Sequence, residues 1–114
     1  MPDQATHTGQ CHCGSVQYEA QGPITFQGTC TCRACQRATG ALASPNIQVP
    51  IETFHVTSGS PTQFKSDSDE GCDAGVFHFC GLCGSQLYWT NGAGTELAIF
   101  VGTLDDTSAF RPGA

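Results

Sequence analysis

Cysteine is the residue type in this chain most able to do chemistry, with eight copies in 114 residues. Seven of the eight fall into three clusters, spaced C-x-C, C-x-C-x-x-C and C-x-x-C. Such short spacings suit two thiolates on one metal ion better than a local disulfide. The first ten residues have no apolar run and no basic start, so we expect no export signal and a cytoplasmic, reducing location. The sequence therefore predicts zinc sites.

The first and last clusters together supply four thiolates, the ligand set of a closed structural zinc site. Cys80 and Cys83 lie three apart, and the glycine after them can adopt a positive φ, which turns backbone N–H groups toward the sulfurs. On an extended strand, Cys11 and Cys13 would face the same side and His12 would point away. A site built from both pairs would tie the start of the chain to a distant hairpin.

The middle cluster, Cys30, Cys32 and Cys35, can bind one ion from a single loop that leads into a helix. Three ligands leave the fourth tetrahedral position open, as catalytic zinc sites require. Zinc with three thiolates activates water poorly, but it suits the binding of an incoming thiol as a reactive thiolate. The alternative is a second closed site with Cys72 as its fourth ligand, which would use all eight cysteines.

Two of the four basic residues flank the middle cluster. Arg33 and Arg37 would lie four apart on one face of a helix. Their guanidinium groups could receive a substrate carboxylate, for which the fork of N–H donors is well shaped. They could equally offset the thiolate charge or be solvated.

Six short segments with alternating or β-branched and aromatic residues predict strands separated by turns. They are residues 16–19, 24–28, 54–58, 76–79, 86–90 and 97–101. One short helix is predicted over residues 33–39, with Gly40 in position for a C-terminal cap, and the polar run 65–73 is typical of an exposed loop. We expect an all-β fold of antiparallel sheets organised around zinc, with one zinc-binding domain at 9–114 after a flexible segment at 1–8.

The charge balance is acidic, with 4 Lys and Arg against 10 Asp and Glu and a formal net charge of −6. Bound zinc with its thiolates would make the protein more negative still. Nucleic acids are then disfavoured as partners, because their binding depends on Lys and Arg neutralising phosphates. No stretch approaches the roughly 18 apolar residues of a membrane-spanning helix. We therefore expect a small-molecule partner, and the sequence gives no indication of oligomeric state.

Four motifs in order resemble the glutathione-dependent formaldehyde-activating enzyme family, which also includes centromere protein V-like proteins. They are G-x-C-x-C-G, C-x-C-x-x-C-x-R-x-T-G, F-C-x-x-C-G and G-T-L-D-D, and they span roughly residues 9–112. The resemblance implies coiled antiparallel β-sheets with two zinc ions. It implies a structural ion on Cys11, Cys13, Cys80 and Cys83, and a catalytic ion on Cys30, Cys32 and Cys35.

The activity that the resemblance implies is the reversible addition of glutathione to formaldehyde, a carbon–sulfur lyase reaction of the S-hydroxymethylglutathione synthase type. The substrate sulfur would meet the open zinc position and attack the aldehyde carbon. Thr31 stands where many relatives carry histidine, and Phe77 stands where arginine is expected. The alternative from another class is a non-catalytic interaction module with two zinc ions, in which Cys72 closes the second site.

Overall fold

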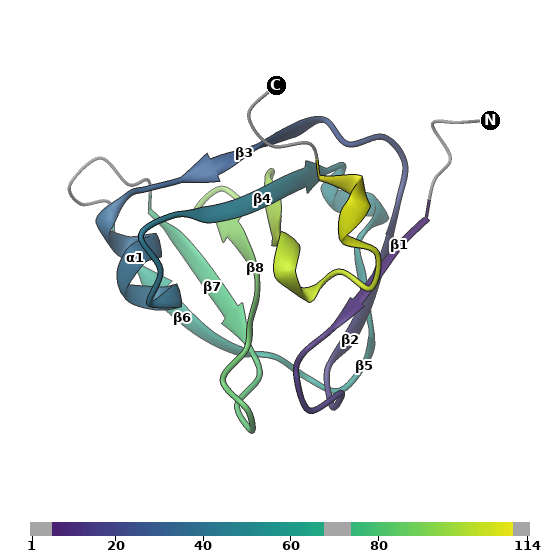
Figure 1. The fold of residues 1–114 in the computed structure, drawn as a ribbon, viewed down its shortest axis with the longest axis horizontal. Coiled ribbons are helices and arrows are strands. Elements are labelled where there is room, and N and C mark those ends of the chain that lie inside the picture. The colour runs from purple at the N-terminus through teal and green to yellow at the C-terminus, as the bar shows by residue number, and fades with distance from the viewer. Residues whose placement is uncertain (1–5, 68–73, 111–114) are drawn as a thin grey trace.

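The computed structural model describes residues 6–67 and 74–110, which form two antiparallel sheets and one short α-helix (Figure 1). The smaller sheet has the strand order β1-β2-β5 and the larger one has the order β3-β4-β9-β8-β7-β6. The smaller sheet contains β1 (Thr6–Gln10), β2 (Gln17–Gln21) and β5 (His55–Ser58). The larger contains β3 (Phe26–Cys30), β4 (Ser44–Val49), β9 (Leu97–Phe100), β8 (Gln86–Asn91), β7 (Gly75–Phe79) and β6 (Thr62–Ser66). The described residues also contain three short 3-10 helices: η2 (Ile51–Thr53), η3 (Val101–Thr103) and η4 (Thr107–Ala109).

The mostly β fold class is confirmed, and each of the six predicted strands overlaps an observed one. Three strands were missed. β1 and β6 are predominantly polar edge strands, and β4 carries Pro45 and Asn46, which are both depleted in strands. Part of the predicted loop at 65–73 is strand, since β6 includes Lys65 and Ser66. β1 begins at Thr6, so it takes in the last residues of the segment 1–8.

The core lies between the two sheets. On the large sheet, Ile47 and Ile99 are directly paired and fully buried. Tyr18 of the small sheet stacks on Phe54 with ring centroids 5.2 Å apart, and Phe54 in turn meets Tyr88 of the large sheet at 4.5 Å. Offset aromatic contacts of this kind add about 0.5–1.5 kcal/mol to the burial of the rings. The rings therefore join the two sheets.

The other face of the large sheet carries a row of directly paired residues that crosses all six strands. We call it the aromatic row, and it runs Phe26, Gln48, Ala98, Trp89, Phe77, Phe64. Directly paired residues project to the same side of a sheet, and their neighbours along the strand project to the other side. The large sheet thus has a core face and a second face that is rich in aromatic side chains.

The single helix among the described residues, α1 (Arg33–Thr39), follows the middle cysteines as predicted. Cys32 is its extended N-cap residue, and Gly40 caps its end at φ 75° with its N–H bonded to the Gln36 carbonyl oxygen. The helix has seven residues and none of them is fully buried. A helix this short is marginal alone, so it needs support from the surrounding chain. No helix in the described part of the chain has the length and apolar character to cross a membrane.

Candidate metal centres and the clefts beside them

The structure brings together the four cysteines of the first and last motifs. The Sγ atoms of Cys11, Cys13, Cys80 and Cys83 all lie within 4.8 Å of one another; we call this group the four-cysteine cluster. Cys11 and Cys80 are each only 1% exposed. His12 is exposed and is not part of the group.

The first cysteine pair lies on a turn and not on the expected extended strand. β1 ends at Gln10, and residues 11–16 connect it to β2. The Cys11 N–H donates to the Val16 carbonyl oxygen at 3.1 Å. In the same way the Cys80 N–H donates to the carbonyl oxygen five residues later, at 3.0 Å. Both cysteine pairs therefore lie on loops that are closed by the same backbone hydrogen bond. The C-x-C spacing alone did not predict this loop for the first pair.

A glycine follows the second cysteine of each loop and has a positive φ, 80° at Gly14 and 82° at Gly84. This conformation is easily adopted only by glycine. In the second loop, the N–H groups of Leu82 and Cys83, which precede Gly84, donate to Cys80 Sγ at 3.3 and 3.4 Å. The predicted positive φ of the glycine is thus confirmed, and its role in directing the N–H groups stays a prediction.

A serine follows each of these glycines, and both serines contact the sulfurs. Ser15 Oγ lies 3.1 Å from Cys13 Sγ and 3.3 Å from Cys80 Sγ. Ser85 Oγ lies 3.3 Å from Cys83 Sγ and accepts the His12 N–H at 2.9 Å. Sequence reasoning missed both serines, although the repeated C-G-S could have identified them.

Hydrogen bonds favour the ionised thiol at two of these cysteines, Cys83 and Cys11, whereas the pKa of Cys13 is raised. The Ser85 hydroxyl and N–H lower the pKa of Cys83 to about 5. Burial raises the pKa of Cys11, but hydrogen bonds from the Val16 N–H and the Ser15 hydroxyl outweigh it and bring the pKa to about 7. Four converging sulfurs with N–H and hydroxyl donors around them fit the ligand set of a tetrahedral Zn²⁺ site.

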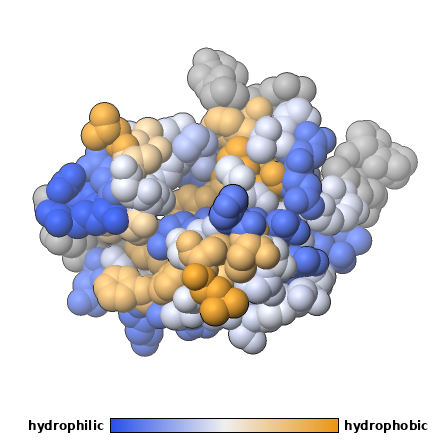
Figure 2. Space-filling model, turned by 60° about the horizontal axis from the view of Figure 1, so that its bottom comes forward, coloured by the Kyte–Doolittle hydropathy of each residue, from blue (hydrophilic) through white to orange (hydrophobic). Residues whose placement is uncertain are grey.

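One of these loops presents an apolar side chain to solvent. Leu82, between Cys80 and Cys83, is 83% exposed. Figure 2 brings the bottom of Figure 1 forward, and apolar residues gather there among hydrophilic ones. The tip of this loop is held by its cysteines and not by burial of its leucine.

The middle cysteines form a second group. Cys30 ends β3, Cys32 caps α1 and Cys35 lies within it, and their Sγ atoms are within 4.8 Å of one another; we call them the three-cysteine cluster. Cys30 Sγ and Cys32 Sγ are 3.3 Å apart. Burial, with a contribution from Cys30, raises the pKa of Cys35 to about 12. The three sulfurs are a donor set that fits zinc.

The oxidation state of Cys32 differs from that of its neighbours. Cys32 is disulfide-bonded, whereas the six other cysteines among the described residues are free thiols. A disulfide sulfur is not a thiolate, so Cys32 joins a metal site only after reduction. Cys72, the alternative fourth ligand, lies outside the described residues.

A cleft of about 250 Å³ opens beside the three-cysteine cluster; we call it the aromatic cleft. All three cysteines of the cluster line it, with residues of the aromatic row and of β4. The remaining lining residues are Phe26, Thr29, Ala34, Asn46, Gln48, Phe77, Trp89, Ala98 and Phe100. The cluster therefore borders a space that a small molecule can enter.

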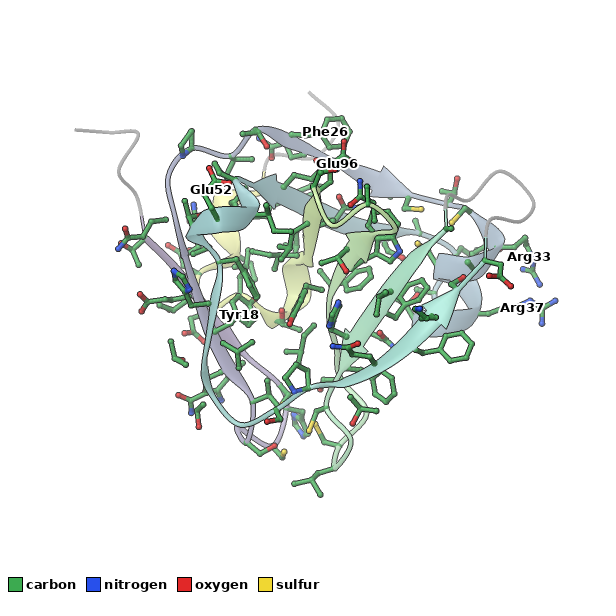
Figure 3. The ribbon with its side chains drawn as sticks, turned by 180° about the vertical axis from the view of Figure 1, so that it is seen from behind. Tyr18, Phe26, Arg33, Arg37, Glu52 and Glu96 are labelled. Atoms are coloured by element: carbon green, nitrogen blue, oxygen red, sulfur yellow. The ribbon has the colours of Figure 1, made fainter. Side chains whose placement is uncertain are left out.

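A larger cleft of about 600 Å³ adjoins it, and Ala34 and Phe77 line both. Arg33, Arg37 and Lys65 line this second cleft, together with Asp67; we call it the cationic cleft. Three of the chain's four basic residues thus lie at one place in an acidic protein. Both arginines are exposed and extend from the same helix (Figure 3). Arg33 donates to Gln36 Oε1 at 2.7 Å.

The sequence did not single out Lys65 or the aromatic row as site residues. Lys65 was assigned to a polar loop, yet it lies on β6, which pairs with β7. There it lines the same cleft as the two arginines of α1. Phe77, noted as a departure from the expected arginine, is 3% exposed and lines both clefts. Only strand register, which local sequence does not encode, brings these residues together.

The model of the family described as glutathione-dependent formaldehyde-activating enzyme matches residues 6–114. This chain belongs to that family. The resemblance inferred from the four motifs is thereby confirmed. A curated protein of Halomonas elongata named "Putative glutathione-dependent formaldehyde-activating enzyme" is 26% identical over 107 residues, which are 91% of this chain and 68% of that protein.

Among solved structures, a Rhodobacter sphaeroides protein has a similar fold, with a TM-score of 0.67. Its sequence is 21% identical, and the match covers 86% of this chain and 87% of that one. At this level of identity the similarity shows the fold alone.

Proposed function

We propose that this protein is a zinc-dependent carbon–sulfur lyase that adds a thiol such as glutathione reversibly to a small aldehyde. The observation that carries the proposal is the position of the three-cysteine cluster, whose three residues all line the aromatic cleft. The residues of the four-cysteine cluster line neither of the two clefts described above. The family's description supports a role in glutathione-dependent formaldehyde activation.

The three-cysteine cluster would hold one zinc ion, which supplies a positive centre that keeps a thiol ionised near neutral pH. α1 keeps the Cys32 and Cys35 sulfurs in place, and β3 positions Cys30. In the reaction, the thiolate sulfur forms a bond to the aldehyde carbon, the C=O electron pair moves to oxygen, and the oxygen takes a proton. No electrons are gained or lost overall, so the reaction needs no oxidant.

The four-cysteine cluster would hold a second zinc ion in a structural role. Its cysteines connect the β1–β2 loop with the β7–β8 loop, and Cys13 and Cys80 are 67 positions apart in the sequence. A closed four-thiolate site of this kind contributes folding free energy directly.

Arg33 and Arg37 of the cationic cleft would receive a carboxylate of the thiol substrate. Guanidinium groups bind carboxylates with paired hydrogen bonds.

The proposal is tested by incubating the zinc-loaded protein with glutathione and formaldehyde and following exchange with S-hydroxymethylglutathione by NMR. Exchange should be faster than in buffer alone, and Cys35→Ser should reduce it to the uncatalysed rate. Leu42→Ala is the control, because Leu42 is 83% exposed and lines neither cleft. Exchange no faster than the uncatalysed reaction in the wild-type protein would rule out formaldehyde as the substrate, and the same result with larger aldehydes would refute the proposal.

A further inference from the structure

The aromatic cleft is larger and more apolar than formaldehyde requires. A water molecule takes up about 30 Å³ in the liquid, and formaldehyde has only two heavy atoms. The cleft has a volume of about 250 Å³, near the lower end of the range for small-molecule sites. Formaldehyde would leave most of this space to water.

The side chains that line the cleft are suited to an apolar group. Phe77 and Trp89 pair directly across β7 and β8, and Trp89 pairs with Ala98 of β9. The small side chain of Ala98 leaves open the space between its larger neighbours. Phe26 extends the same row at β3 and is 55% exposed, so it forms the outer wall of the cleft.

The apolar wall and the sulfurs lie on the same face of the sheet. Every second residue of a strand projects to the same side, so Phe26, Gly28 and Cys30 of β3 share one face. The Phe26 ring lies against Gly28, because a Cβ added to Gly28 would come within 3.0 Å of it. An aldehyde carbon near the Cys30 sulfur would therefore have its substituent directed along aromatic side chains.

We propose that this site takes aldehydes with an apolar substituent about the size of a phenyl ring in preference to formaldehyde. The inference rests on the proposed function for its chemistry. The reaction is R–SH + R′–CHO giving R–S–CH(OH)–R′, in which one C–S bond forms and the thiol proton ends on oxygen. The substituent R′ occupies the aromatic cleft, while carboxylates on R reach the adjoining cationic cleft.

Binding to the cleft can be measured without catalysis, because the chain's one tryptophan, Trp89, lines it. Benzyl alcohol, which cannot add a thiol, is titrated into the zinc-loaded full chain while Trp89 fluorescence is followed. A saturable change is expected, with a Kd about fivefold higher in Phe26→Ala, as expected from the loss of part of an apolar wall. Leu42→Ala also shortens an exposed apolar side chain, but outside the cleft. This variant should bind benzyl alcohol with the same Kd as the wild type. No saturable change, or equal Kd values in Phe26→Ala and wild type, would overturn the inference.

The reaction is then compared for phenylacetaldehyde and formaldehyde with glutathione as the thiol. We expect a higher kcat/KM for phenylacetaldehyde, and the ratio of the two should fall by about fivefold in Phe26→Ala. Reaction of formaldehyde alone, without benzyl alcohol binding, would overturn the inference and leave the proposed function standing. Reaction of neither aldehyde in a protein that binds benzyl alcohol would refute the proposed lyase activity, and with it the preference between aldehydes.

Discussion

Ser15 Oγ lies 3.3 Å from Cys80 Sγ, although the two residues are 65 positions apart in the sequence. The same hydroxyl is 3.1 Å from Cys13 Sγ. Ser15 thus contacts one cysteine from each loop of the four-cysteine cluster. Groups that hydrogen-bond to metal ligands orient them and strengthen metal binding.

Replacing Ser15 should weaken zinc binding at the four-cysteine cluster alone. We expect Ser15→Ala to lower the affinity of this site by about 10-fold, the lower end of the effect of such partners. Zinc release to a chromophoric chelator measures the affinity. The three-cysteine cluster of the same protein is the internal control, and its release should not change. Equal release from wild type and Ser15→Ala would show that this hydroxyl contributes nothing to metal retention.

Loss of a ligand should affect stability very differently at the two clusters. A structural zinc site contributes on the order of 10 kcal/mol to folding, so Cys80→Ser should yield unfolded or insoluble protein. Cys35→Ser should be much milder, because the three-cysteine cluster joins only residues 30–35. Thermal unfolding followed by circular dichroism compares the two. Equal melting temperatures for purified Cys80→Ser and Cys35→Ser would contradict the division into a structural and a reactive site.

Metal content should be two zinc equivalents per chain when the protein is prepared with reductant and without chelator. Reductant matters because Cys32 must be a thiol to serve as a ligand. A brief exposure to chelator should remove one equivalent first, from the three-cysteine cluster, which has fewer ligands. Elemental analysis before and after treatment measures this. A preparation that holds one equivalent even with added zinc would rule out the second site.

Gly75→Ala should displace the Trp89 ring, which lines the aromatic cleft. A Cβ at Gly75 would fall on the Trp89 indole ring, so the ring must move. We expect a shift in tryptophan fluorescence and a loss of about 1–3 kcal/mol of stability, typical of overpacking. Gly102→Ala is the matched control, because no atom lies within 4 Å of a Cβ there. Identical emission spectra for wild type and Gly75→Ala would mean that the ring does not rest on this glycine.

Local sequence carried much of the fold. β7, β8 and β9 are rich in aromatic and aliphatic residues, and α1 has its glycine cap at Gly40, so these elements were predictable. β4 was not, because Pro45 and Asn46 disfavour a strand, although β4 pairs with β3 and β9 on its two sides. Tertiary pairing there outweighs intrinsic preference. The boundaries of one domain at 9–114 stay a prediction.

The site was predictable where short cysteine motifs mark its residues. The cysteine spacings indicated both clusters, and the structure gathers the same residues. The row from Phe26 to Phe64 could not be predicted from the sequence, because each of its residues comes from a different strand and only the strand register aligns them. Lys65 was missed for the same reason. Long-range pairing thus determines the shape of the clefts, whereas short motifs determine the metal ligands.

The central claim is that the three-cysteine cluster holds a metal ion with a position open to a thiol. Cobalt substituted for zinc reports this directly, because its visible spectrum changes with its ligands. Added glutathione should shift the spectrum of the wild-type protein, while the four-cysteine site, isolated in Cys35→Ser, should not respond. A wild-type spectrum that no thiol changes would contradict the account and favour the non-catalytic module with both sites closed.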